Sequence, residues 1–347
     1  MTKNYKEIKD IMINIASPLS KAREVAPLAK AGADEFYCCV TPKDWRDNYG
    51  MVESISRRNN PFAHLSSYGE LGRVIRNSHK YGVKVHAALN EVYNRDQIDF
   101  LIKQVETFYE MGVDAIILGD IASLLAVRES GIPVRIFMGT GGTIFNSQTV
   151  ELYRGLGVRR MILPRHLSIS EIKAIISKST REEMMEFEVF IFRGLCPYID
   201  GFCRFQHGVN ETLGRKPRVD LACACKFRIK TIVEGEAPDS DRRREIKRLM
   251  SPRQSLTGCG LCGLYDLIKI DGLTSLKIVG REFSSNEKIE DLKLVKKCMD
   301  LLVDTPEISR DEYFKFCRKE FLEFFEKECS YKDCYYPELR RYQAICE

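Results

Sequence analysis

Short runs of apolar, often β-branched residues alternate along the chain with longer stretches in which apolar residues recur every three or four positions. The first pattern is typical of buried strands and the second of amphipathic helices. The sequence therefore predicts parallel βα units over most of its length. The eight predicted strands are Ile11–Ser17, Glu35–Val40, Lys84–Asn90, Ala115–Asp120, Val134–Gly139, Arg160–Pro164, Glu186–Phe192 and Ser275–Val279.

A glycine stands between several predicted helices and the strand that follows. Glycine suits the left-handed residue that comes directly after a helix, so each such glycine marks a helix end. Eight βα units fit an α/β fold of the (β/α)8 TIM-like barrel class, and an open doubly wound sheet is the alternative. The glycines lie in AKAGADEFY, HKYGVKVHA, YEMGVDAII and RGLGVRRMI, and the clearest predicted helices are Lys21–Ala31, Tyr68–Tyr81, Arg95–Met111 and Ser168–Ser177.

Two connections after predicted strands are far longer than the usual few residues: Thr41–Ser67, and Gly194–Thr274 between strands 7 and 8. Connections of this kind lie on the catalytic face of a barrel. We expect residues 1–302 to form the barrel, including the cysteine-rich insertion 194–274. Residues 303–347 are expected to form a small C-terminal appendage that also contains cysteines.

The composition is that of a soluble globular protein, with 44% hydrophobic and 30% charged residues. The N-terminus lacks a signal-type apolar segment and the chain lacks an uninterrupted apolar stretch long enough to span a membrane, so we expect a cytoplasmic protein without a membrane partner. The net charge of +5 is spread over 54 basic and 49 acidic residues. This is weak support for RNA binding, because nucleic-acid binders usually concentrate charge on one face.

The thirteen cysteines indicate metal ligation or chemistry, because structural disulfides rarely persist in the cytosol. Thiolates bind zinc or iron–sulfur clusters, and the residues alone do not distinguish these two kinds of site. A third interpretation is that the thiols bind no metal. Cys259 and Cys262 have the C-x2-C spacing of a zinc knuckle. Six cysteines fall in the insertion, Cys196, Cys203, Cys223, Cys225, Cys259 and Cys262, and four in the tail, Cys317, Cys329, Cys334 and Cys346, where a second cluster or a zinc site is predicted.

Several segments resemble the U-type, or collagenase-like, peptidase family. Its members also include subunits of oxygen-independent ubiquinone hydroxylation and enzymes that hydroxylate transfer or ribosomal RNA. The resemblance covers roughly residues 12–302. Its carriers are AKAGADEFY, KVHAALN, FNSQTVELYRGLGVRRMILPRHLSISEI, the pair in RGLCPYIDGFC, CACKF, and SLKIVGRE followed by a helix.

The resemblance implies a barrel with a 4Fe–4S cluster, a hydroxylation that does not use molecular oxygen, and prephenate as the oxygen donor. Cys196 and Cys203 match the family's cysteine pair. The third ligand is Cys223 or Cys225 and the fourth is Cys262 or Cys259, of which we choose Cys223 and Cys262.

Polar residues at the ends of the predicted strands are candidate contacts for a substrate, because strand ends project into the mouth of a barrel. Arginine and lysine suit a dicarboxylate such as prephenate. Each residue could instead form a structural ion pair or a helix cap. The candidate catalytic residues are Asn90, Asp120, Asn146 and Arg165, and the candidate substrate-binding residues are Arg193, Lys277 and Arg281.

The sequence thus predicts an iron–sulfur enzyme of hydroxylase type that acts on an aromatic or nucleobase substrate. One alternative is a peptidase, as the family name suggests, although the chain has no H-E-x-x-H, G-x-S-x-G or P-loop motif. Another is a non-catalytic iron–sulfur subunit that docks on a homologous enzyme, and a homo-oligomer is also possible. At least one of Cys38 and Cys39 is expected to reach the barrel mouth, although a core position is favoured for both.

Overall fold

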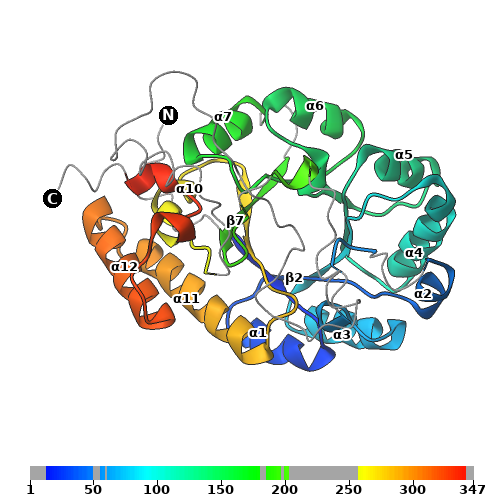
Figure 1. Ribbon diagram of the computed structural model, residues 1–347, viewed down its shortest axis with the longest axis horizontal. Coiled ribbons are helices and arrows are strands. Elements are labelled where there is room, and N and C mark those ends of the chain that lie inside the picture. Colours follow the sequence, from blue (N-terminus) through cyan, green and yellow to red (C-terminus); the bar gives the residue numbers. More distant parts are fainter. Residues whose placement is uncertain are drawn as a thin grey trace, which may run out of the picture.

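The computed structural model describes residues 13–49, 55–58, 61–179, 185–196, 199–202 and 257–340. In these ranges, eight parallel strands close into a barrel in chain order, with the last strand paired to the first (Figure 1). The predicted barrel is confirmed, and each predicted strand overlaps an observed one. The strands are β1 Asn14–Pro18, β2 Glu35–Cys38, β3 Lys84–Leu89, β4 Ala115–Leu118, β5 Ile136–Met138, β6 Arg160–Ile162, β7 Glu186–Phe192 and β8 Leu273–Ile278.

Helices surround the barrel as an outer ring (Figure 1). The predicted helix-ending glycines have positive φ angles, for example 105° at Gly32 and 72° at Gly82, which a side chain would disfavour. The ring contains α1 Val25–Lys30, α3 Tyr68–Lys80, α4 Ile98–Glu110, α5 Ile121–Glu129, α6 Ser147–Gly155, α7 Ile169–Ser179 and α11 Ser285–Asp304, and the further helices are α2 Lys43–Tyr49, α10 Leu264–Leu267 and α12 Arg310–Phe325.

The helices pack on the barrel through one apolar face each. On α3 this face buries Leu71, Val74 and Ile75, and Ser67 caps the helix by accepting a hydrogen bond from the backbone of Glu70. Each fully buried aliphatic side chain contributes about 1.5–3 kcal/mol relative to an exposed one. The outer layer is therefore held by ordinary hydrophobic packing, and no helix of the described residues is long and apolar enough to cross a membrane.

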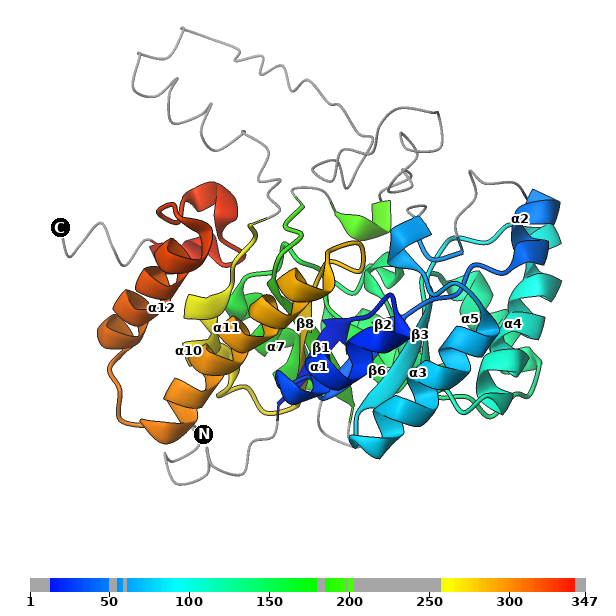
Figure 2. The same ribbon diagram turned by 90° about the horizontal axis from the view of Figure 1, so that it is seen from below.

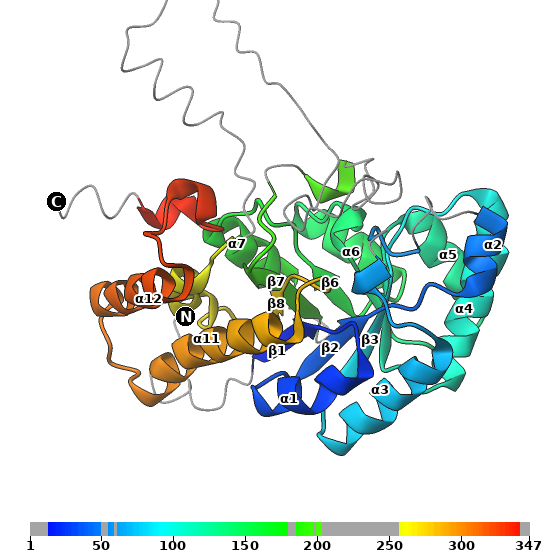
Figure 3. The same cartoon turned by 60° about the horizontal axis from the view of Figure 1, so that its bottom comes forward.

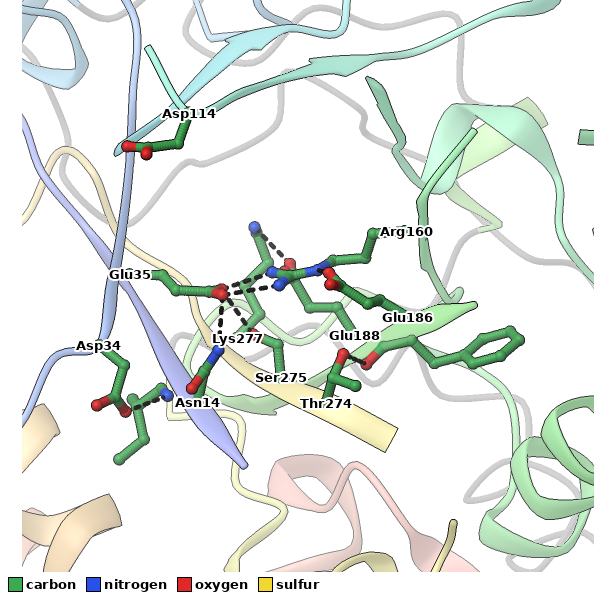
Figure 4. A network of polar contacts seen from close by, with 12 residues as sticks. Asn14, Asp34, Glu35, Asp114, Arg160, Glu186, Glu188, Thr274, Ser275 and Lys277 are labelled. Atoms are coloured by element: carbon green, nitrogen blue, oxygen red, sulfur yellow. Dashed lines mark hydrogen bonds and ion pairs between the residues drawn. The ribbon is translucent and has the colours of Figure 1, made fainter. Parts of the chain in front are cut away.

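A charged network fills part of the barrel interior (Figure 4). Arg160 on β6 donates to the Glu35 carboxylate on β2 at 2.5 and 2.7 Å and to Glu188 on β7 at 3.1 Å. Lys277 on β8 donates to Glu188 at 2.7 Å. Ser275 donates to Glu35 at 3.1 Å. Two buried cations thus face two buried carboxylates, which offsets the cost of burying charge. Arg160 also donates to the partly exposed Glu186 at 2.9 Å.

The chain after residue 302, which the sequence sets apart as an appendage, has extensive contacts with the barrel. The Tyr336 hydroxyl donates to the backbone oxygen of Phe190 on β7 at 3.1 Å. The Glu338 carboxylate accepts a hydrogen bond from the backbone of Ile169 at 2.8 Å and so caps the start of α7. Figure 2 shows α12 alongside α11, and Figure 3 shows the red C-terminal segment next to α7. The tail thus covers the side of the barrel formed by β7, α7 and α10.

Candidate active site at the barrel mouth

Arg165, which follows β6, pairs with Asp200 in the connection after β7. Its Nε and Nη2 donate to the two carboxylate oxygens at 3.0 and 3.1 Å, and its Nη1 donates to the backbone oxygen of Gly194. Burial acts against the charged guanidinium, but the charge and hydrogen bond of Asp200, together with Tyr335 and Cys196, outweigh it, so the pKa of Arg165 is raised. Its guanidinium also lies 4.7 Å from the centre of the Phe190 ring. Arg165 therefore remains cationic at the end of β7.

The connection after β7 is fixed in place by two further contacts. Gly201 lies so close to Thr143, in the GTGGT loop after β5, that an added Cβ would come within 2.2 Å of its methyl group. Arg57, from the connection after β2, donates to the backbone oxygen of Asp200 at 3.2 Å. Connections that follow four strands, β2, β5, β6 and β7, thus meet at Asp200 and Gly201.

Cys196 follows β7 in the same region. Its thiol is close enough to Arg165 and Tyr335 to affect the ionisation of both. Tyr335, from the C-terminal tail, donates its hydroxyl proton to the backbone oxygen of Arg193. Cys196 thus stands at the carboxyl end of a barrel strand, beside a cationic group and a tyrosine.

Three buried polar atoms at the mouth have no hydrogen-bond partner within the described part of the chain: Nη1 of Arg281, Oδ1 of Asn90 and Oε2 of Glu282, whose other carboxylate oxygen pairs with Arg58 at 3.3 Å. Arg281 follows β8 and is 5% exposed, and Asn90 follows β3. A buried polar atom left unpaired costs about 1–3 kcal/mol. Nη1 of Arg281 is a cationic donor and the other two atoms are acceptors, so the three suit a ligand that carries both an anionic group and hydrogen-bond donors.

Four other predicted site residues have structural partners instead. Asp120 and Asn146 are the N-caps of α5 and α6, each accepting a backbone hydrogen bond at 3.0 Å. Arg193 donates three hydrogen bonds of 2.7–3.0 Å to Asp291 on α11. Lys277 belongs to the interior network. In these four residues the polar side chain is used in a helix cap or an ion pair, so they are not part of the proposed site.

The cysteines divide into separate places. Cys259, Cys262, Cys329 and Cys334 line one pocket, which we call the cysteine pocket. Cys317 is buried on α12 outside the lining of this pocket. The remaining predicted ligands, Cys203, Cys223, Cys225 and Cys346, lie outside the described residues. Among the residues the structure describes, no three Cys, His, Asp or Glu side chains stand in ready metal-binding geometry.

Both cysteines at the end of β2 are buried, and burial raises their pKa values, to about 12 for Cys38 and about 11 for Cys39. Cys39 lies next to Ser56 and Arg281 at the mouth. Sequence reasoning missed Ser56, Arg57 and Asp200 as site residues. Asp200 offered a signal, since it is an acidic residue between the paired cysteines of RGLCPYIDGFC.

The family model of peptidase family U32 matches residues 20–343. The chain is 27% identical to tRNA hydroxylation protein P2 of Bacillus subtilis, over 86% of this chain and 88% of that protein. It is 25% identical to an uncharacterized protease of Methanocaldococcus jannaschii, over 88% and 69% of the two chains. It is 24% identical to a 23S rRNA 5-hydroxycytidine synthase of Escherichia coli, over 62% of this chain and 30% of that enzyme. Because the family model covers most of the sequence, this protein belongs to peptidase family U32.

Proposed function

We propose that this protein hydroxylates a base in RNA at the barrel mouth, without molecular oxygen and with a small anionic oxygen donor such as prephenate. The similarity to tRNA and rRNA hydroxylation proteins supports a hydroxylase role on nucleic acid. The observation that carries the proposal is the free buried Nη1 of Arg281, which would bind a carboxylate of the donor. Asn90 would accept a hydrogen bond from a hydroxyl or amino group of the bound molecule.

Phe202 supports a nucleobase as the acceptor. Its ring is 67% exposed and belongs to the connection after β7. One side is packed against Phe145 at 5.9 Å between ring centres, and Phe145 in turn contacts His166 at 5.2 Å. Proteins that recognise unpaired RNA bases commonly stack them on such aromatic side chains. Phe202 would therefore hold a flipped or single-stranded base close to Arg165 and Cys196.

One proposed ligand of an iron–sulfur cluster, Cys196, is among the described residues at the mouth. It lies beside the cationic Arg165. The other proposed ligands are Cys203 and Cys223 or its neighbour Cys225, whereas the candidates for the fourth, Cys262 and Cys259, line the separate cysteine pocket. A bound 4Fe–4S cluster would supply electron transfer when all irons have cysteine ligands, or Lewis-acid activation of the donor when one iron is open. Arg165 would offset the negative charge of the thiolates, and Arg281 would orient the donor.

The proposal is tested in cells that lack their own tRNA hydroxylation protein. Such cells would express this chain during growth without oxygen, and total RNA would be digested and its nucleosides measured by mass spectrometry. We expect a nucleoside one oxygen atom heavier, which disappears with Cys196→Ser. A matched control is Cys298→Ala, which removes a buried thiol of α11. Unchanged nucleosides in all strains would contradict the proposal, unless mixing with a homologous subunit restores activity.

A peptidase is the second reading, suggested by the family name and by the M. jannaschii relative. The Thr41 hydroxyl lies 3.2 Å from Nδ1 of His64, as a nucleophile and its base would. However, burial lowers the pKa of His64 to about 3. An imidazole with so low a pKa binds a proton weakly, so the Thr41–His64 pair gives little support to peptide cleavage.

A further inference from the structure

Two cysteine-bearing turns from distant parts of the chain lie against each other beside β7. One turn carries Cys259 and Cys262, and the other carries Cys329 and Cys334. The first turn is closed by a hydrogen bond from the backbone of Gly263 to Gly260 at 2.8 Å. The second contains a short helix, Tyr331–Asp333. In that turn the Asp333 carboxylate accepts from the backbone and hydroxyl of Ser330 at 3.1 and 2.6 Å.

The main chain holds the two turns in register. The backbone of Cys259 donates to the oxygen of Asp333 at 2.7 Å, and the backbone of Tyr335 donates to the oxygen of Cys259 at 2.9 Å. Cys259 and Cys334 are thereby partners in a short parallel bridge. The thiols of Cys262, Cys329 and Cys334 all lie close enough to Cys259 to influence its charge. Backbone contacts thus fix Cys259 against Cys334, and all four cysteines line the same pocket.

Glycines next to the cysteines make this close packing possible. A Cβ at Gly263 would lie 2.5 Å from the ring of Tyr336, and one at Gly260 would lie 2.9 Å from the same ring. Tyr336 is itself anchored to β7 by its hydroxyl. The glycines of the segment GCGLCG therefore allow the tight turn that carries Cys259 and Cys262. The ring of Tyr336 from the tail packs against these glycines.

We infer that Cys259, Cys262, Cys329 and Cys334 bind one metal centre that fastens the C-terminal tail to the barrel. The spacings C-x2-C and C-x4-C fall in the range of protein metal sites, and thiolates bind zinc and iron–sulfur clusters. In the described residues the four thiols do not yet stand in metal-binding geometry, so metal binding would require them to converge on a common centre. A site with four protein ligands is closed and structural, unlike a catalytic site with an open position.

The metal centre in the cysteine pocket does not depend on the proposed function. It does change which cysteines remain to bind the cluster at the mouth. If the cysteine pocket uses Cys259 and Cys262, the insertion still provides four cysteines for the mouth: Cys196, Cys203, Cys223 and Cys225. It also differs from the tail set predicted from sequence, because Cys317 does not line the pocket, although its thiol forms a hydrogen bond with Cys262. The ten cysteines of the insertion and tail then comprise two sets of four, with Cys317 and Cys346 left over.

The test is the metal content of the full chain purified without oxygen, measured as zinc, iron and acid-labile sulfide per chain. The Cys329→Ser/Cys334→Ser variant should lose one centre, read as zinc or as iron with sulfide. Cys196→Ser should lose a different one, and Cys38→Ala, which removes a buried thiol of β2, should lose none. A double variant with the metal content of the wild type would overturn the inference. If the double variant loses a metal centre but Cys196→Ser keeps the metal content of the wild type, the result contradicts the cluster at the mouth and not the centre in the cysteine pocket.

A second measurement uses the wild-type protein, so that a misfolded variant does not decide the result. Alkylation of the native protein, followed by mass spectrometry, should leave Cys329 and Cys334 unlabelled until a chelator or an oxidant removes the metal. Equal labelling before and after metal removal would overturn the inference. A disulfide between Cys259 and Cys334 in protein purified without oxygen would overturn it as well.

Discussion

Arg281 donates two hydrogen bonds to Ser56, both from Nη2, at 3.2 Å to the backbone oxygen and 3.1 Å to the hydroxyl. These bonds join the connection after β2 to the end of β8 and orient the guanidinium. Its other terminal nitrogen, Nη1, remains buried without a partner in the described ranges. The contact with Ser56 therefore preorganises one donor for a ligand at the mouth.

Replacing Arg281 should weaken use of the anionic donor. A hydrogen bond to a charged group is worth about 1.5–3 kcal/mol, so Arg281→Gln should lower kcat/KM for the donor roughly 10- to 100-fold. Arg281→Lys keeps the charge but loses the second nitrogen, and should recover part of the loss. Steady-state kinetics with varied donor would measure this. Arg154→Gln, which removes an α6 surface ion pair, is the control, and an equal loss there would refute the role of Arg281.

Replacing Phe202 should weaken RNA binding. Stacking of a base on an aromatic ring contributes about 1–3 kcal/mol, so Phe202→Ala should raise the Kd for single-stranded RNA roughly 5- to 100-fold. Phe202→Trp should retain binding because it keeps a stacking face. Fluorescence anisotropy at fixed salt would measure the affinity. The control is Leu152→Ala, which removes a 52% exposed apolar side chain from α6. Unchanged affinity in Phe202→Ala would exclude the stacking role.

Removing Arg160 should destabilise the barrel strongly. Arg160→Met leaves Glu35 and Glu188 without the cation that faces both of them, a change that costs about 3–5 kcal/mol for a buried pair. Arg135→Met is the matched control, because Arg135 also pairs with Glu186 but has a 43% exposed side chain. It should cost less than about 1 kcal/mol. Urea unfolding would compare the two, and similar losses would show that the network contributes little.

Stability should fall with acid in a range set by Glu35. Burial acts to raise its pKa, but the hydrogen bonds and charge of Arg160, with His86 and Asn14, together outweigh burial and lower it to about 2 from 4.5. A lowered pKa gives stability that is present above pH 4.5 and lost as pH falls toward 2. The shift corresponds to about 3 kcal/mol.

The check for Glu35 is urea unfolding of the metal-free protein between pH 6 and pH 2. The unfolding free energy of the wild type should decline over the lower part of this range. Glu35→Gln should be less stable at pH 6 and should show a shallower decline. Parallel pH profiles for the two proteins would mean that Glu35 does not carry the effect.

The barrel could be predicted from sequence because its signals are local. Each strand is an apolar run, and glycines such as Gly82 and Gly112 mark helix ends by their backbone conformation. The interior network could not be predicted, because Glu35 and Arg160 are 125 residues apart and meet only when the barrel closes. The contacts of the tail could not be predicted for the same reason, since Tyr336 contacts β7 at a separation of 146 residues.

The site was predicted in part, for a related reason. A residue directly after a barrel strand is often also the residue directly before a helix. Asp120 and Asn146 are good N-caps, and the same residue types serve as mouth ligands, so the sequence cannot separate the two roles. Arg281 and Asn90 follow strands without capping a helix, and their polar atoms remain available. Partners such as Ser56 come from a long connection whose path no local pattern reveals.

The most direct test of the central claim is a reaction with the isolated, cluster-loaded chain, RNA and prephenate labelled with heavy oxygen, in the absence of molecular oxygen. Mass spectrometry of the digested RNA would follow the label. The account predicts a hydroxylated nucleoside that carries heavy oxygen, absent with Cys196→Ser and strongly reduced with Arg281→Gln. A fully loaded protein that leaves the RNA unmodified, or that cleaves peptides equally well with and without Cys196, would contradict it.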